Sequence, residues 1–266
     1  MFNFRSNQAG QALLVVVLVM IIALTVGLSL ISRSITSIKT STEEANSQKA
    51  LSAAEAGVEQ SIKSNSAIGN PSFGSDTKFQ TSVTKVLGTS FLLNGGDIIQ
   101  RDDSADVWLS DYSTESAKLY LNPVSANVTV NFGTSSNLCN NPAIEIDVVS
   151  GGKANPILNK YSYDGCVSRR AANHFSAPAG GAGNIIDGVS FVSKTPSISV
   201  NFGLFLRITP IYADSKIGIS SSVALPAQGS IITSTGTTGT ATRKITVYQG
   251  FPKIPAEFFP YSLFSP

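Results

Sequence analysis

The sequence predicts an α+β protein in which a long N-terminal α-helix packs on a C-terminal antiparallel β-rich globular domain. Residues 12–31 form an uncharged apolar run, the next segment lacks helix breakers, and the remaining chain shows short alternating runs rich in β-branched residues. We therefore expect four parts. These are a leader peptide (1–10), a long helix (11–68), an exported β-rich domain (69–248) and an aromatic, proline-rich C-terminal tail (249–266).

The apolar run, ALLVVVLVMIIALTVGLSLI, explains why the mean hydropathy of the chain is positive, at +0.15. A helix of this length spans about 30 Å, the thickness of a bilayer core. Arg5 in the leader favours a cytoplasmic N-terminus and an external C-terminal domain. A cleaved secretory signal is the alternative, but its apolar run is only about 7–15 residues long. We therefore expect residues 12–31 to be a transmembrane segment.

The helix is expected to continue well beyond the membrane. From Ile31 to Ala67 there is no proline and one glycine, Gly57, before Gly69 and Pro71 stop the pattern. Apolar positions on this outer half form two stripes on opposite sides of the helix. The first stripe consists of Ile31, Ile35, Ile38 and Ala45, and the second of Leu51, Ala54, Val58 and Ile62. We expect the first to contact neighbouring helices and the second the chain's own β-domain; an amphipathic stalk with accidental spacing is the alternative.

Three N-terminal features occur together. A short basic leader ends in Gly10, an apolar run opens one long helix, and the sequence AlaAlaGluAlaGly follows at 53–57. In this combination about the first 65 residues resemble type IV pilins and type II secretion pseudopilins, and look most like the PilX-like and GspK-like minor pilins. The resemblance implies a pilin-like fold. It also implies cleavage by a prepilin peptidase between Gly10 and Gln11, with methylation of the new amine on Gln11.

The resemblance further implies that the apolar helix assembles with similar helices. The residues expected to take part are Val15, Ala23, Gly27, Ile31, Ile35 and Ile38. Val15 occupies the fifth position of the mature chain, where major pilins carry a glutamate that pairs with a neighbour's amine. The absence of this glutamate fits a subunit at the fibre tip, a subfamily that assembles without the pair, or a chain that never enters a fibre. We favour a minor or tip-proximal subunit.

The second part of the chain has the pattern of half-buried antiparallel strands. The expected strands are residues 125–132, 143–149, 204–212, 216–225 and 243–248. We find no second helix. About 195 residues is long for one small sheet, so an extra β-layer or a long insertion is expected between about residues 95 and 190.

Cys139 and Cys166 are the only two cysteines. In an exported domain the simplest expectation is that they pair, and closing this loop would stabilise the fold by about 3–4 kcal/mol. Two separate buried thiols are the alternative.

The composition argues against several classes of function. Charged residues make up 14% of the chain and the net charge is +2, so we expect no nucleic-acid contact. No GxSxG motif occurs, and His174 has no companions at metal-ligand spacing, so we expect no enzyme and no cofactor. Asp102, Asp103 and Asp106 form a weak candidate metal site without the EF-hand pattern. We prefer to interpret them as a solvated turn before a strand that carries Trp108.

The C-terminal tail contains four Phe, one Tyr and four Pro within 18 residues, which excludes a helix. Its aromatic side chains either pack back on the sheet or form a docking strand for another pilin-like subunit.

The expected function is that of a structural pilin-like subunit of a type IV pilus or a related secretion pseudopilus. Its partners would be other pilin-like subunits, the prepilin peptidase, the inner-membrane assembly platform and membrane lipid around residues 12–31. It would reside in the cytoplasmic membrane and in a cell-surface filament (fimbrium). The alternative is a membrane-anchored, surface-displayed β-rich binding module that does not assemble.

Overall fold

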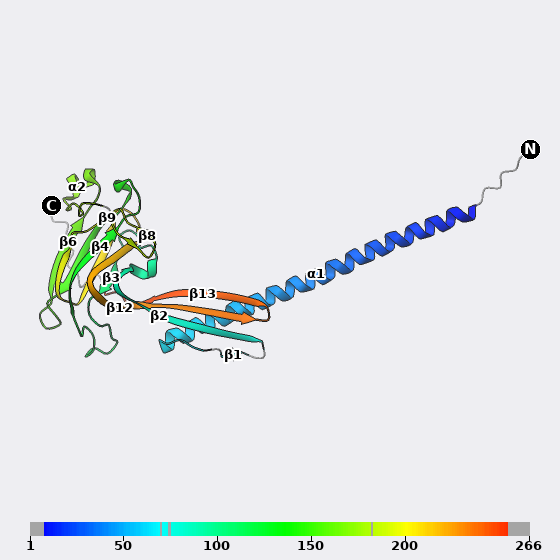
Figure 1. Ribbon diagram of the computed structural model, residues 1–266, viewed down its shortest axis with the longest axis horizontal. Helices are drawn as coiled ribbons and strands as arrows, with labels where there is room; N and C mark the ends of the chain where they lie inside the picture. Colours follow the sequence, from blue (N-terminus) through cyan, green and yellow to red (C-terminus); the bar gives the residue numbers. More distant parts are fainter. Residues whose placement is uncertain (1–7, 70, 74–75, 182, 255–266) are drawn as a thin grey trace, which may run out of the picture. The chain divides into compact units, whose positions relative to one another are not determined.

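A computed structural model describes residues 8–69, 71–73, 76–181 and 183–254. The architecture is α+β, with one long N-terminal helix packed on antiparallel strands, as the sequence predicts (Figure 1). The chain divides into two compact units. Unit 1 comprises the described residues within Met1–Lys63, Ala67–Thr81 and Ser234–Ile245, and unit 2 those within Ser64–Ser66, Ser82–Thr233 and Thr246–Pro266.

Helix α1 (Gln8–Ser64) is 57 residues long and has no break. It ends because Asn65 adopts a left-handed conformation with φ of 48°, which a helix cannot continue through. Hydroxyl groups along the helix donate to backbone carbonyls of the preceding turn, so they satisfy themselves locally. These pairs are Thr25 with Ile22, Thr36 with Ser32 and Thr42 with Ile38.

In unit 1, parts of three long strands lie along the C-terminal half of α1 (Figure 1). The strands are β2 (Thr77–Leu92), β12 (Ile217–Thr238) and β13 (Ala241–Gly250), with the short β1 (Ser72–Phe73) paired to β2. β12 lies between β2 and β13 in the sheet. Gly239 in the tight turn between β12 and β13 has φ of 56°, which suits a two-residue hairpin.

The face that α1 buries is made of small residues. The buried positions in this half are Ala50, Ala53, Ala54, Gly57, Val58 and Ser61. The predicted second stripe is therefore wrong at its ends, because Leu51 and Ile62 are 41% and 40% exposed. The backbone of Gly236 in β12 and the buried ring of Phe79 in β2 lie directly on this face, so the helix has no room for large side chains there, and its larger residues project sideways.

Unit 2 contains two antiparallel sheets around one core. The first adds β4 (Val124–Phe132), β9 (Ser193–Lys194) and β10 (Ile198–Gly203) to β12. The second has the order β3-β11-β5-β6, with β3 (Ala105–Trp108), β11 (Phe205–Ile211), β5 (Ala143–Ser150) and β6 (Ile157–Tyr163). Alternate residues of each strand enter the core, as a two-residue period requires. Central core members are Val128, Val130, Phe132, Ile144, Ile146, Leu206, Ile208, Ile217 and Ile219.

The five predicted strands are confirmed as β4, β5, β11, β12 and β13, although β12 runs on to Thr238. The four-stranded sheet supplies the extra layer that the chain length predicted. The expectation of no second helix was wrong: α2 (Val167–Asn173) follows Cys166 directly. The remaining short elements are the 3-10 turns η1 (Leu93–Gly96) and η2 (Leu138–Asn140) and the ribbon of β7 (Ile185–Ile186) and β8 (Val189–Ser190).

Candidate assembly surface on helix α1

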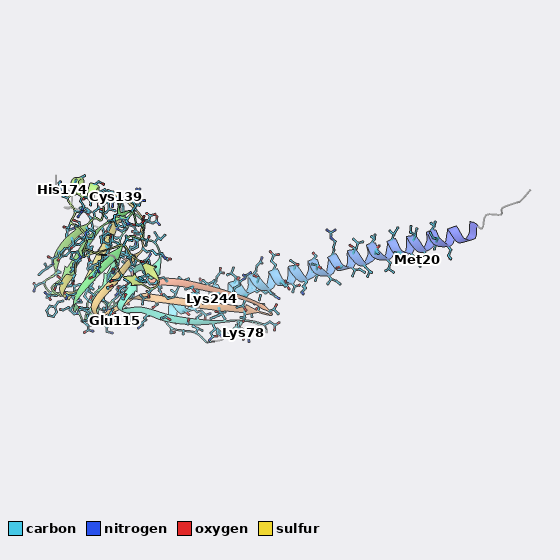
Figure 2. All side chains as sticks on the ribbon, turned by 45° about the horizontal axis from the view of Figure 1, so that its top comes forward. Met20, Lys78, Glu115, Cys139, His174 and Lys244 are labelled. Atoms are coloured by element: carbon cyan, nitrogen blue, oxygen red, sulfur yellow. A yellow bond between two sulfur atoms is a disulfide. The ribbon has the colours of Figure 1, made fainter. Side chains whose placement is uncertain are left out.

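The N-terminal half of α1 exposes an apolar surface. From Leu13 to Ala45 every side chain is exposed except at Gly27, which is half-buried (Figure 2, around Met20). All six residues predicted to act in helix assembly lie on this stretch: Val15, Ala23, Gly27, Ile31, Ile35 and Ile38. Within unit 1 this surface is therefore available to something outside the chain.

The exposed stretch has the length and composition of a membrane span. Within the described residues α1 is the helix that is apolar and long enough, with a mean hydropathy of 3.1 in its most apolar window and none of that window buried. The hydroxyl of Thr25 donates to the carbonyl of Ile22 at 2.8 Å, so it needs no partner in a hydrocarbon environment. The helix could cross a membrane on these grounds alone.

Gly27 is placed differently from the other glycine of the helix. A Cβ atom added at Gly27 would have no atom of this chain within 4 Å, so packing within the chain does not require glycine there. At Gly57 a Cβ would lie 2.8 Å from the ring of Phe79. Small residues on an exposed apolar helix allow another helix to approach closely.

The contacts of α1 with the strands begin at Asn46 and Ser47. Arg243 of β13 donates from Nε to the Ser47 hydroxyl at 2.8 Å, and Asn46 lies beside Gly239. Further along, the backbone of Gly236 in β12 lies directly against that of Ala50 and Ala54. Figure 2 shows Lys78 and Lys244 on the strands of this part. The repeated spacing of Ala and Gly between 50 and 57 is the signal in the sequence that could have identified this buried face.

The predicted processing site lies close to Gln8, the first described residue. Gly10 and Gln11 are both part of α1 (Gln8–Ser64), but their side chains, and residues 1–7 of the expected leader, lie outside the described residues. Cleavage and methylation therefore remain predictions.

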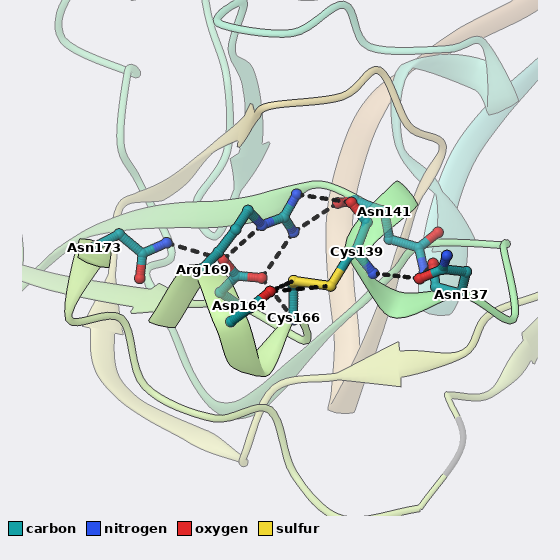
Figure 3. The surroundings of a disulfide bond; sticks show 8 residues. Asn137, Cys139, Asn141, Asp164, Cys166, Arg169 and Asn173 are labelled. Carbon is teal, nitrogen blue, oxygen red and sulfur yellow. Dashed lines mark hydrogen bonds and ion pairs between the residues drawn. A yellow bond between two sulfur atoms is a disulfide. The ribbon is translucent and has the colours of Figure 1, made fainter. Parts of the chain in front are cut away.

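The disulfide between Cys139 and Cys166 is present, as the sequence predicts (Figure 3). Beside it, the Asp164 carboxylate accepts hydrogen bonds from Arg169 at 2.8 Å and 3.0 Å and from the backbone N–H of Cys166 at 2.8 Å. Arg169 also donates to the carbonyls of Cys139 and Asn141. The network ties η2, β6 and α2 together around the disulfide.

Burial alone would raise the pKa of the Asp164 carboxyl. The hydrogen bonds from Arg169, Cys166 and Asn173 outweigh this effect and hold its pKa below the ordinary value of 3.8. Asp164 is therefore a charged, fully partnered group with a structural role in this part of unit 2.

The three carboxylates of the weak metal candidate each have a basic partner. Asp102 pairs with Arg101 at 3.4 Å, Asp103 with Lys253 at 2.8 Å and Asp106 with Arg207 at 2.7 Å. Among the described residues no group of three His, Cys, Asp or Glu side chains could hold a metal ion. The predicted strand with Trp108 is β3, and Asp102 and Asp103 precede it. Asp106, however, lies within β3 and its side chain is only 4% exposed, so the expectation of a solvated turn is wrong for this residue. His174 caps the C-terminus of α2 with φ of 58°.

Comparisons with protein-family profiles, with curated protein sequences and with solved structures give no match for this chain. Its function must therefore be argued from the exposed helix and the units themselves.

Proposed function

We propose that this chain is a structural, pilin-like subunit, minor or tip-proximal, of a type IV pilus or a related secretion pseudopilus. The observation that carries the proposal is the continuity of α1. One unbroken helix begins as an exposed apolar surface of membrane length and ends as an integral part of unit 1, packed on β2, β12 and β13. A helix that only tethered a domain would not need the close backbone contact that α1 makes with Gly236 of β12 at Ala50 and Ala54.

The mechanism of such a subunit is physical. Leaving a large apolar side chain in water instead of burying it costs about 1.5–3 kcal/mol, so the stretch Leu13–Ile31 needs either lipid or other helices around it. Because lipid tails and apolar side chains are similar environments, a helix can move from the membrane into a bundle of like helices at modest cost. Ala23, Gly27 and Ser29 permit the close approach that such a bundle requires.

The mass of the mature chain tests whether the leader is cleaved after Gly10 and whether Gln11 is methylated. Full-length protein is extracted from membranes of the native host and its N-terminal peptide is analysed by mass spectrometry. We expect a chain that starts at a methylated Gln11, and a Gly10→Val variant that keeps its leader. An intact Met1, or a start well beyond Gln11, would contradict the proposal.

Assembly is tested separately by shearing filaments from intact cells. A subunit is recovered in the sheared fraction together with other pilin-like chains. A non-assembling binding module, the alternative function, would stay entirely with the membranes even when its leader is processed.

A further inference from the structure

The outer face of the four-stranded sheet in unit 2 carries two adjacent cross-strand rows. The charged row, from β6 to β3, consists of Lys160, Asp147, Arg207 and Asp106. The apolar row beside it consists of Leu158, Val149, Phe205 and Trp108. Charges in the first row alternate in sign, and Lys160 and Asp147 are joined at 3.1 Å. This face thus has an apolar band next to neutralised charges.

A groove of about 470 Å³ follows the apolar band. Its walls include Val149, Leu158 and Phe205, with Ile157 and Lys153 toward the β6 side and Ile254 toward the C-terminus. The walls are mostly apolar, so the groove suits an apolar or aromatic occupant better than a charged one.

The chain is held in place where it reaches this groove. The N–H of Ile254 donates to Asp106 Oδ2 at 3.0 Å, and its carbonyl accepts from Arg207 Nη2. Three residues earlier, the Phe251 ring lies 4.3 Å from the Tyr112 ring centroid and 6.0 Å from that of Trp108. The described part of the chain therefore ends at the rim of the groove.

Residues 255–266 of the predicted C-terminal tail lie outside the described residues. We propose that this segment of the same chain occupies the groove and covers the outer face of the four-stranded sheet. The segment PAEFFPYSLFSP matches the groove in chemistry, since it has five large apolar or aromatic residues, and its one charged residue, Glu257, is opposite in sign to Lys153. Its three prolines favour an extended chain that packs through side chains and forms no hydrogen-bonded ladder.

Reach and burial agree with this occupant. Twelve extended residues span about 40 Å, well over the width of four strands spaced about 4.8 Å apart. Asp147 and Lys160, two and three strands away from β3, are only 13% and 20% exposed and pair with each other at 3.1 Å, so an apolar segment that crosses this outer face would cover no unpaired charge there. A segment tethered at Ile254 also has an effective concentration in the millimolar range, so it outcompetes most free partners.

The test traps the segment in the full-length chain by disulfide formation. Ile157→Cys lines the groove and is 57% exposed, so the substitution leaves the core intact. It is combined in turn with Ala256→Cys and with Ser262→Cys. The matched control combines the same tail cysteines with Ile185→Cys, which is 73% exposed and lies in β7 of the same unit. The cysteine pair 139 and 166 is already bonded, so the introduced thiols react with each other.

After brief oxidation with diamide, non-reducing electrophoresis and mass spectrometry report the products. We expect an intramolecular cross-link to Cys at 157 to form at least about five times faster than to Cys at 185, for one or both tail positions. Adding Phe258→Ser and Phe259→Ser should bring the two rates together. Equal rates in the parent pairs would overturn the proposal. So would a cross-linked dimer, which would assign the groove to the tail of a second copy.

Discussion

Gly236 sets how closely β12 approaches helix α1. A Cβ at this position would lie against the carbonyl oxygen of Ala50 and 2.6 Å from the nitrogen of Ala54, which are backbone atoms that cannot rotate away. Gly236→Ala should lower the free energy of unfolding by about 1–3 kcal/mol through overpacking. Gly27→Ala is the control, since open space surrounds it and alanine favours the helix by about 1 kcal/mol. Chemical denaturation in detergent measures both; equal stability of the two variants would refute the close approach.

The Asp164 carboxyl gives unit 2 a pH-dependent stability. Because its pKa in the folded chain lies below the ordinary 3.8, its stabilising effect is complete above that value and is lost as the pH falls through the folded pKa. Asp164→Asn should cost about 3 kcal/mol at pH 7, since it leaves Arg169 without its buried partner. It should also lose less stability than the parent on acidification below pH 4.

Thermal unfolding across a pH series checks both parts of this prediction. Asp102→Asn is the matched control, because the Asp102 carboxylate is 68% exposed and its pair with Arg101 should contribute little. A pH profile of Asp164→Asn that parallels the parent at all acid pH values would contradict the role assigned to this carboxyl.

At the scale of elements, two patterns in the sequence predicted most of the architecture. The apolar run 12–31 and the lack of helix breakers after it predicted α1 to within a few residues of its ends, and two-residue alternation predicted five of the strands. Helix α2 was missed because its seven residues are too few to show a period; the bonds of Arg169 and the disulfide at Cys166 hold it. β2 was missed since only a few of its residues are buried, so its alternation is weak.

The buried face of α1 shows the limit of judging a stripe by hydrophobicity. Leu51 is more apolar than Ala54, yet Ala54 is fully buried and Leu51 is 41% exposed. Ala54→Leu should therefore destabilise the chain by about 1–3 kcal/mol through overpacking, whereas Leu51→Ala should cost under about 1 kcal/mol. Denaturant unfolding measures the free energy of unfolding of both variants. A larger loss of stability for Leu51→Ala than for Ala54→Leu would support the buried stripe predicted from the sequence.

The same helix gives a prediction that rests on the proposed function. Gly27→Leu fills a position that is open within the chain, so unfolding of the units should not change. If neighbouring helices approach closely there, recovery in sheared filaments should fall at least about tenfold, the effect of roughly 1.4 kcal/mol per contact. Leu28→Ile, on the adjacent exposed position, is the control and should assemble normally. Normal assembly of Gly27→Leu would remove Gly27 from the proposed contact.

For the whole molecule, three strands link the two units, since β2, β12 and β13 each have residues in both. The candidate surface, in contrast, lies entirely on α1 before Asn46. Sequence patterns could locate this surface because a membrane-length apolar run needs no tertiary information. They could not locate the groove on the four-stranded sheet, which depends on the register of β3, β11, β5 and β6.

This separation predicts that the apolar half of α1 is dispensable for folding. The first contacts with the strands are at Asn46 and Ser47, and residues 13–45 are exposed apart from the half-buried Gly27. A chain of residues 32–266 should therefore fold in water without detergent and melt within about 5 °C of the full-length chain, because no buried contact is lost. A chain starting at Ser52 loses Asn46, Ser47 and the buried Ala50, and should melt well below it. Circular dichroism with temperature measures all three. Equal melting of the two shortened chains would mean that the packing of Ala50 contributes nothing, whereas failure of residues 32–266 to fold would show that the apolar half supports the rest of the molecule.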